Sequence, residues 1–427
     1  MALLVLAMAA SVLAKEDGGA KGGIDKKMTK DIDQAIVKGR DWLQAAAVKE
    51  LSVPLAAGIT HGSKNYTFPV GRLALLGLAM LESRVPPSDA LLLRIWEKIR
   101  TKPPATTYDA GVGLLFAEAY LRASNGGRHV TKLEPRDQEW IRKAAAYLAS
   151  GCFGGAWTYR CPGASDGYPI GEDPKRKYSL GDAGGEDPDE ELAQKVAESE
   201  GQNPGGVHDH SNSQYAVLGL KAASLCGVKV KNARLLWRTV VYHFLKDQEA
   251  SGPEVDLKLT REEGGKGSED YSMDDEPKPR ARGWSYGGPS KAYGSMSAAG
   301  MTALRVAQSE VEDLSGEERH RIKLSVRDCL AWFQVNWAMD KNPLSEHSGG
   351  GMAPAAHYYH LYGVERIGML TQVRAIAGHA WYKEGAELLL KVQKPDGSWL
   401  SPAQGYPEDD RVKTAYALLF LARSTRE

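Results

Sequence analysis

Two histidines separated by one residue form the first segment of the sequence that could do chemistry. His208, Asp209 and His210 come directly before a predicted helix. Imidazole nitrogens bind divalent metals and titrate near neutral pH, so this segment could hold an ion or act as acid and base. A helix cap would account for Asp209 alone. The pattern leaves a metal site, acid–base chemistry and structural hydrogen bonding open.

A second histidine pair lies in a later segment. His357 and His360 are three positions apart on a predicted helix, so they share one face, and Tyr358 lies between them. This pair could bind a metal, or it could lie beside the first pair if the fold brings the two helix starts together. We predict catalytic roles, with a divalent metal as the cofactor that would suit these side chains, for His208, Asp209, His210, His357, Tyr358 and His360.

Aromatic and polar side chains near other helix starts are candidates for ligand binding. Aromatic rings stabilise cations and stack on sugars, whereas carboxylates favour helix N-termini. The predicted ligand-binding residues are Asp109, Gln214, Tyr215, Trp284, Tyr286, Tyr362 and Asp409.

Helical segments of two kinds alternate along the chain and must position these residues. The first kind is amphipathic, with one apolar stripe, and comprises residues 32–47, 90–99, 137–150, 232–248, 317–337 and 381–393. The second kind is apolar on nearly every side, which requires packing all round, and comprises residues 70–82, 109–123, 212–225, 296–307, 358–373 and 412–423.

Six alternations predict six helical hairpins. An open solenoid would need polar end caps, but residues 412–423 are as apolar as any other segment. We therefore expect an all-α fold, an (α/α)6 toroid with the apolar helices inside. The loops that enter the inner helices would collect at one mouth, together with two long insertions at residues 162–206 and 250–282 that could act as lids.

Several amphipathic segments are followed by a related phrase. Gln393 precedes Gly397 and Trp399, Gln248 precedes Gly283 and Trp284, and Gly155 precedes Trp157. Glutamine followed by glycine-x-tryptophan resembles the QW repeat of squalene-hopene-type cyclases. On this basis residues 30–425 look like the terpenoid cyclase and protein prenyltransferase superfamily, whose members are α/α toroids.

The catalytic motifs of that superfamily do not accompany the repeat. The cyclase phrase Asp-x-Asp-Asp is absent, since Asp270 is followed only at a different spacing by Asp274 and Asp275. The resemblance therefore implies a fold and an apolar or isoprenoid-like ligand in a central cavity, and it assigns no catalytic residue. A carbohydrate-active lyase or hydrolase and a non-catalytic protein- or peptide-binding module stay open as alternatives, so the sequence does not decide whether the chain is an enzyme.

Composition limits the partners and the domain plan. Basic and acidic residues number 54 each, so no excess positive charge is available to hold nucleic acid, and no apolar stretch reaches the roughly 20 residues of a transmembrane helix. The partner expected is a small molecule or a polymer. Residues 1–14 resemble the apolar core of an export signal. We predict a disordered linker at residues 15–27 and a single domain at residues 28–427.

Cysteine usage fits this picture. The chain has 4 cysteines, too few to hold a fold of this size together. Cys152 and Cys161 could pair in an exported protein, whereas Cys226 and Cys329 lie inside helical patterns and are expected to be buried.

Overall fold

A computed structural model describes residues 24–55, 58–59, 66–128, 130, 132–161, 208–230, 232–261, 271, 276–348, 356–399 and 409–423. Twelve α-helices and two small sheets lie within these residues. The amphipathic helices are α1 (Lys26–Ser52), α3 (Ala90–Arg100), α5 (Pro135–Ser150), α8 (Ala233–Lys246), α10 (Gly316–Val335) and α12 (Trp381–Val392). The apolar helices are α2 (Pro69–Glu82), α4 (Thr107–Ser124), α7 (His210–Leu225), α9 (Gly294–Glu310), α11 (His357–Thr371) and α13 (Asp410–Ala422). The predicted all-α class is confirmed.

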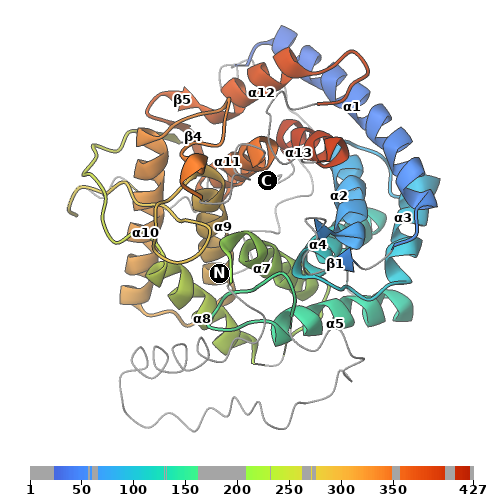
Figure 1. The fold of residues 1–427 in the computed structure, drawn as a ribbon, viewed down its shortest axis with the longest axis horizontal. Coiled ribbons are helices and arrows are strands. Elements are labelled where there is room, and N and C mark those ends of the chain that lie inside the picture. Colours follow the sequence, from blue (N-terminus) through green and yellow to red (C-terminus); the bar gives the residue numbers. More distant parts are fainter. Residues whose placement is uncertain are drawn as a thin grey trace.

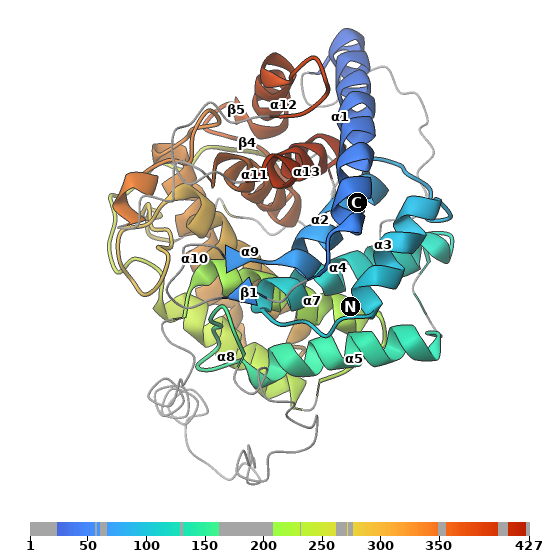
Figure 2. The same ribbon diagram turned by 45° about the vertical axis from the view of Figure 1, so that its right-hand side comes forward.

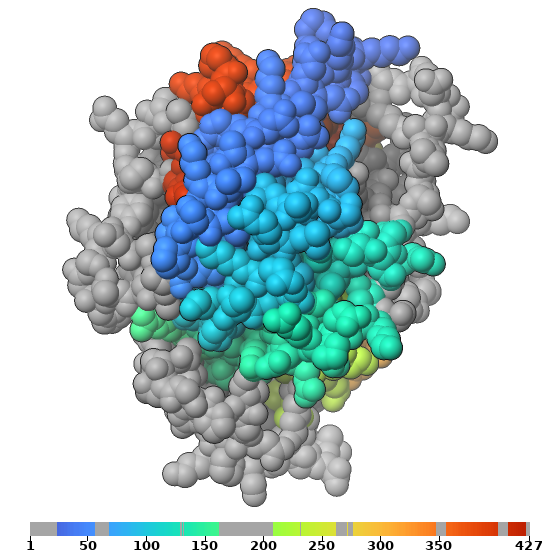
Figure 3. Space-filling view, turned by 90° about the vertical axis from the view of Figure 1, so that its right-hand side faces the viewer, coloured from blue at the N-terminus to red at the C-terminus, as the bar shows by residue number. Residues whose placement is uncertain are grey.

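The two kinds of helix occupy different layers. Figure 1 shows the apolar helices around the middle of the molecule and the amphipathic helices outside them. Successive inner helices contact one another, α2 with α4, α4 with α7, α7 with α9, α9 with α11 and α11 with α13, and α13 also contacts α1 and α2. The same two layers are visible from a second direction, in Figure 2. In Figure 3, α1 in blue lies beside α3, with α5 in teal beyond them.

Burial follows the sequence pattern of each layer. In α3, Asp89 caps the helix by accepting from the Leu91 backbone N–H, and the buried residues Leu92, Ile95, Trp96 and Ile99 form one stripe. In α2, by contrast, eleven of the twelve residues from Pro69 to Met80 are buried, and Arg72 is the exception. A helix with no polar face is stable only when other elements cover it on every side, which is the situation of the inner layer.

Three tryptophans fasten loops to the ends of outer helices. The indole N–H of Trp157 donates to the carbonyl of Leu148 at 2.7 Å. Trp284 donates to Phe244 at 2.8 Å, and Trp399 donates to Leu389 at 2.9 Å. All three rings are fully buried. The repeated phrase in the sequence thus corresponds to a repeated structural clamp.

The glutamines of the same phrase connect neighbouring outer helices. The side-chain amide of Gln248, after α8, donates to the carbonyl of Ser325 in α10 at 2.9 Å. Gln393, after α12, donates to the carbonyl of Ala35 in α1 at 2.9 Å. The same type of bond therefore joins two consecutive outer helices and the last outer helix to the first.

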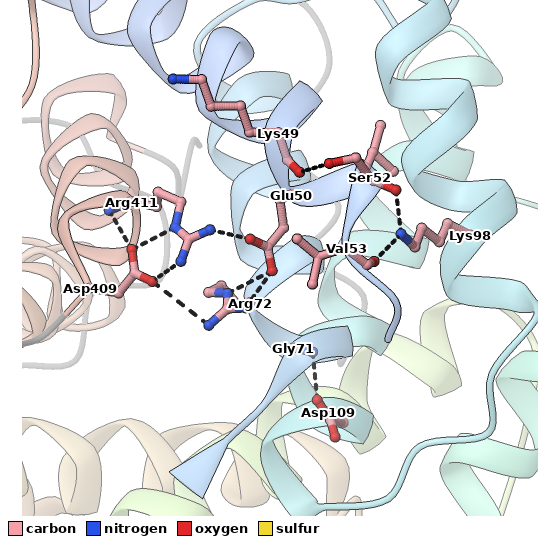
Figure 4. A network of polar contacts seen from close by, with 11 residues as sticks. Lys49, Glu50, Ser52, Val53, Gly71, Arg72, Lys98, Asp109, Asp409 and Arg411 are labelled. Carbon is pink, nitrogen blue, oxygen red and sulfur yellow. Dashed lines mark hydrogen bonds and ion pairs between the residues drawn. The ribbon is translucent and has the colours of Figure 1, made fainter. Parts of the chain in front are cut away.

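A charged network also joins the two ends of the chain (Figure 4). Glu50 of α1 is 2% exposed and pairs with Arg72 of α2 and with Arg411 of α13. Asp409 caps α13, pairs with Arg411 and lies 3.7 Å from Arg72. Two carboxylates and two guanidinium groups thus neutralise one another at this half-buried position.

Short strands and one boundary differ from the sequence reading. Strands β1 (Gly58–Ile59) and β2 (Tyr66–Thr67) form one antiparallel pair. Strand β3 (Leu259–Arg261) lies in the predicted second insertion and pairs with β4 (Val373–Ile376), which pairs with β5 (His379–Ala380). Part of that insertion is therefore packed against the helical body. Residue Gln372 ends α11 in the left-handed region, which stops the helix before Val373.

The N-terminal boundary is also earlier than expected. Asp25 caps α1 by accepting from the Met28 backbone N–H, so Lys26 and Lys27 are helical and not part of a disordered linker. The signal-like residues 1–14 and the first insertion, residues 162–206, lie outside the described residues. None of the described helices is long and apolar enough to cross a membrane. All four cysteines carry free thiols, and Cys226 and Cys329 are buried as predicted.

Candidate functional site

Three histidines converge on one carboxylate oxygen between α7 and α8. The Nε2 atoms of His208, His210 and His243 lie 3.5, 3.4 and 3.6 Å from Oδ2 of Asp247. The ligand atoms of His208, His243 and Asp247 all lie within 4.8 Å of one another. We call these four residues the histidine–aspartate cluster. Only His208 is partly exposed, with 27% of its side chain accessible, whereas His210 and His243 are at 0%.

Local geometry explains how the cluster forms. Asp209 has extended backbone angles, φ −143° and ψ 151°. Because side chains alternate sides along extended backbone, His208 and His210 point toward α8 while Asp209 points away. His243 and Asp247 are four positions apart at the end of α8, so they share one helix face. The two elements together supply all four side chains.

Asp209 itself caps α7. Its carboxylate accepts from the backbone N–H and the side-chain amide of Asn212, both at 2.7 Å. Burial raises its pKa to about 6, against the lowering effect of the Asn212 and Tyr286 hydrogen bonds. Asp209 is thus oriented by the helix start and by an aromatic neighbour, and it is not part of the cluster that flanks it.

The second predicted histidine pair has different partners. Nε2 of His357 lies 2.7 Å from the carbonyl oxygen of Met339, and Nε2 of His360 lies 3.0 Å from that of Ala338. Burial lowers the pKa of both imidazoles, to about 4 for His360. As neutral rings they tie the start of α11 to the loop after α10. Neither belongs to the histidine–aspartate cluster, three of whose members, His208, His243 and Asp247, form the metal-compatible group found among the described residues.

Four aromatic rings from distant segments meet at the N-terminal ends of inner helices. Phe68 precedes α2, and Tyr108 lies in the first turn of α4. Tyr159 lies in the segment after α5, and Tyr286 precedes α9. Phe68 is 4.9 Å from Tyr108 and 6.1 Å from Tyr159 between ring centroids. The hydroxyls of Tyr159 and Tyr286 lie 2.6 Å apart. We call these four residues the aromatic patch, and each of them is partly exposed.

The hydroxyl of Tyr108 connects the patch to the interior. It hydrogen-bonds to the hydroxyl of Ser211, which lies 3.1 Å from that of Tyr359. The side-chain amide of Gln214 donates to the same Tyr359 hydroxyl at 2.9 Å. Gln214 is therefore a structural partner of a buried tyrosine.

Several predicted ligand-binding residues lie inside the packed interior. Tyr215 is 1% exposed, and its hydroxyl lies 2.7 Å from that of Tyr416. The guanidinium of Arg366 lies 4.0 Å from the ring centroid of Tyr362 and 5.8 Å from that of Tyr215. These rings hold a buried cation of the protein itself. Tyr358, a predicted catalytic residue, is also 1% exposed.

The remaining predicted ligand-binding residues make contacts that stabilise the fold. Trp284 is the indole clamp on α8 described above and packs on Gly300, where a side chain would collide with its ring. Asp409 belongs to the charged network at the chain ends. Asp109 is 1% exposed, accepts from the Gly71 N–H at 2.7 Å, and has its pKa raised to about 6 by burial.

Sequence reasoning missed half of the cluster. His243 and Asp247 lie in an amphipathic helix, where charged residues are expected on the solvent side. The available signal was their four-residue spacing, which puts an imidazole and a carboxylate on one face. It also missed Phe68 and Tyr159 of the aromatic patch, whose positions in loops carry no periodicity.

Comparison with known proteins gives no relative. No protein-family model matches the chain, no curated protein matches it, and no solved structure matches it.

Proposed function

We propose that the chain is a closed (α/α)6 toroid of the terpenoid cyclase type that binds an apolar or isoprenoid-like ligand at the aromatic patch. Closure is supported by the contacts of α13 with α1 and α2 and by the Gln393–Ala35 bond. The superfamily resemblance is supported by the three indole clamps, which repeat the same contact at Trp157, Trp284 and Trp399.

The observation that carries the ligand proposal is the meeting of Phe68, Tyr108, Tyr159 and Tyr286 at the N-terminal ends of inner helices. A single partly exposed ring is common on a protein surface, whereas four rings that gather offer a large apolar surface of the kind that marks a binding site.

The kind of ligand follows from the hydroxyl groups. The hydroxyls of Tyr159 and Tyr286 bond to each other, and that of Tyr108 bonds to Ser211. With these polar atoms engaged by the protein, the patch presents ring faces and edges to a ligand. An apolar chain is satisfied by such a surface, whereas a sugar would need polar partners for its own hydroxyls.

Direct binding tests this proposal. Radiolabelled geranylgeraniol should bind the full chain saturably, and Tyr286→Ala should weaken binding at least tenfold because it removes one ring of the patch. Tyr242→Ala, on outer helix α8, is the matched control and should bind like the wild type.

Two results would count against the proposal. One is no saturable binding of geranylgeraniol by the folded protein. The other is binding of an acidic oligosaccharide in its place, particularly with release of unsaturated sugar read as ultraviolet absorbance, which would support the carbohydrate-active alternative.

A further inference from the structure

Within the histidine–aspartate cluster, His210 and Asp247 present acceptor atoms to each other. Nδ1 of His210 lies 2.7 Å from the carbonyl oxygen of Ser285, and a carbonyl only accepts, so Nδ1 carries the hydrogen. In the neutral ring, Nε2 then directs a lone pair toward the Asp247 carboxylate oxygen 3.4 Å away. Two facing acceptors repel each other unless a cation lies between them.

His243 strengthens this argument. Its ring is at 0% exposure, and among the described residues neither of its nitrogens has a hydrogen-bond partner. A buried polar group without a partner is costly, so native proteins rarely retain one.

The position of Asp247 also favours a nearby positive charge. It is the C-cap residue of α8 and is 4% exposed. The C-terminus of a helix carries partial negative charge, so a buried carboxylate there is unfavourable without a nearby cation. Its Oδ2 has no hydrogen-bond partner among the described residues. Lys246 precedes it, but the groups that Oδ2 faces are the three imidazoles.

The ligand atoms of His208, His243 and Asp247 lie within 4.8 Å of one another, and Nε2 of His210 lies 3.4 Å from Asp247 Oδ2. Ligands about 2.0–2.1 Å from a tetrahedral zinc ion lie about 3.3–3.4 Å from one another. The three separations from Asp247 Oδ2 are 3.4, 3.5 and 3.6 Å. Three imidazole nitrogens and one carboxylate oxygen form a donor set that suits zinc. The carbonyl of Ser285 supplies the outer hydrogen bond that orients a metal-bound histidine.

We propose that His208, His210, His243 and Asp247 bind one zinc ion as a four-coordinate structural site. The ion fastens residues 208–210, at the start of inner helix α7, to the end of outer helix α8. Because Asp209 lies between two ligands and contacts the aromatic patch through Tyr286, the ion also fixes one side of that patch. With four protein ligands the ion keeps no open position for substrate, which is typical of structural zinc. This site does not depend on the proposed apolar ligand.

Metal analysis of the full chain tests the site. The protein is stripped with a chelator, incubated with zinc chloride, dialysed and analysed by mass spectrometry for zinc. We expect one zinc per chain, a higher Tm with zinc than without it, and, after cobalt(II) substitution, the strong visible absorption of a tetrahedral site. Substoichiometric zinc in the wild type, or the weak spectrum of octahedral cobalt, would overturn the proposal.

Substitutions locate the ion. His243→Gln, His210→Gln and Asp247→Asn should each lose stoichiometric zinc while similar far-ultraviolet circular dichroism shows that the chain is folded. His320→Gln is the control, because its half-exposed side chain lies on α10 beside Glu276. Full zinc content in all three cluster variants would contradict the assignment. If a variant fails to fold, the wild-type stoichiometry and cobalt spectrum still decide, and neither measurement involves the apolar ligand.

Discussion

The side-chain amide of Gln393 donates a 2.9 Å hydrogen bond to the backbone carbonyl of Ala35, across 358 positions of sequence. The same amide donates to the carbonyl of Gly397 at 3.0 Å, within its own turn. One side chain therefore shapes the loop after α12 and attaches that loop to α1. The first and last helical pairs are held together by the type of contact that also joins α8 to α10.

Gln393→Glu tests this attachment. The substitution replaces the amide NH2 group, which donates both hydrogen bonds, by a carboxylate oxygen that cannot donate. The carbonyl oxygens of Ala35 and Gly397 then lose their donor, and leaving buried acceptors unsatisfied costs about 1–3 kcal/mol. The free energy of unfolding in urea should fall by that amount. Gln138→Glu, on the exposed face of α5, should leave it nearly unchanged. Equal losses in the two variants would mean that the Gln393 bonds do not stabilise the fold.

Glu50→Gln is expected to be more damaging. Glu50 is 2% exposed and pairs with two guanidinium groups, of Arg72 and Arg411, which the neutral amide would leave partly uncompensated. Breaking one side of a buried ion pair costs about 3–5 kcal/mol, and the partial exposure of both arginines places the expected loss at or below about 3 kcal/mol. Chemical denaturation measures it. Asp31→Asn removes the exposed pair with Lys27 and should cost much less than Glu50→Gln. An equal loss in the two variants would refute the difference in burial as the cause.

Gly397→Ala separates backbone strain from steric collision. Gly397 has φ +94°, and a Cβ there would collide with the backbone carbonyl of Lys38 in α1. Gly126 has φ +66° with open space around it, so Gly126→Ala carries strain alone, of about 1 kcal/mol. We expect Gly397→Ala to lower the Tm clearly further than Gly126→Ala. Similar Tm values would show that the loop after α12 can move away from α1.

The buried carboxyl of Asp109 should make the free energy of unfolding depend on pH. Burial raises its pKa to about 6 in the folded state, against an ordinary value near 3.8. The folded protein therefore holds a proton more tightly than the unfolded chain, so this residue's contribution to stability falls as the pH rises from about 4 to about 6 and is constant above that. The maximum size is roughly 3 kcal/mol for a shift of about 2 pH units.

Asp109→Asn isolates that contribution. The amide oxygen can still accept from Gly71, but the side chain no longer ionises. Urea unfolding at pH 4.5 and pH 6.5 should show a smaller loss of stability in the variant than in the wild type, and the difference between the two removes the effect of other titrating groups. An identical pH dependence would mean that Asp109 titrates near its ordinary pKa.

The helices were predictable because their signals are local. The apolar stripe of α3 and the all-round apolar character of α2 follow from neighbours three and four positions apart, and both helices lie where expected. The ends were less predictable. Val373 was expected to end a helix and instead begins β4, because it pairs with a strand from residues 259–261 that no local pattern connects to it.

The candidate site was predictable in part for the same reason. His208 and His210 stand out in the sequence, and alternation along extended backbone does place them on one side. Their partners His243 and Asp247 come from another helix, and only the packing of α7 against its neighbours decides that the four side chains face one another. His357 and His360 also stand out in the sequence, but their rings bind the backbone carbonyls of the loop after α10 and do not join the cluster.

The all-α class, the two kinds of helix and the clamp residues could all be predicted from local sequence, because each depends on short-range periodicity or on a fixed phrase such as Gln393, Gly397 and Trp399. Which polar groups share a site depends instead on how the helices pack. Glu50 meets Arg411, and His208 meets Asp247, through contacts between distant elements. The physical reason is that side-chain chemistry acts over a few ångströms in space, and the distance between residues in space is set by how whole helices pack.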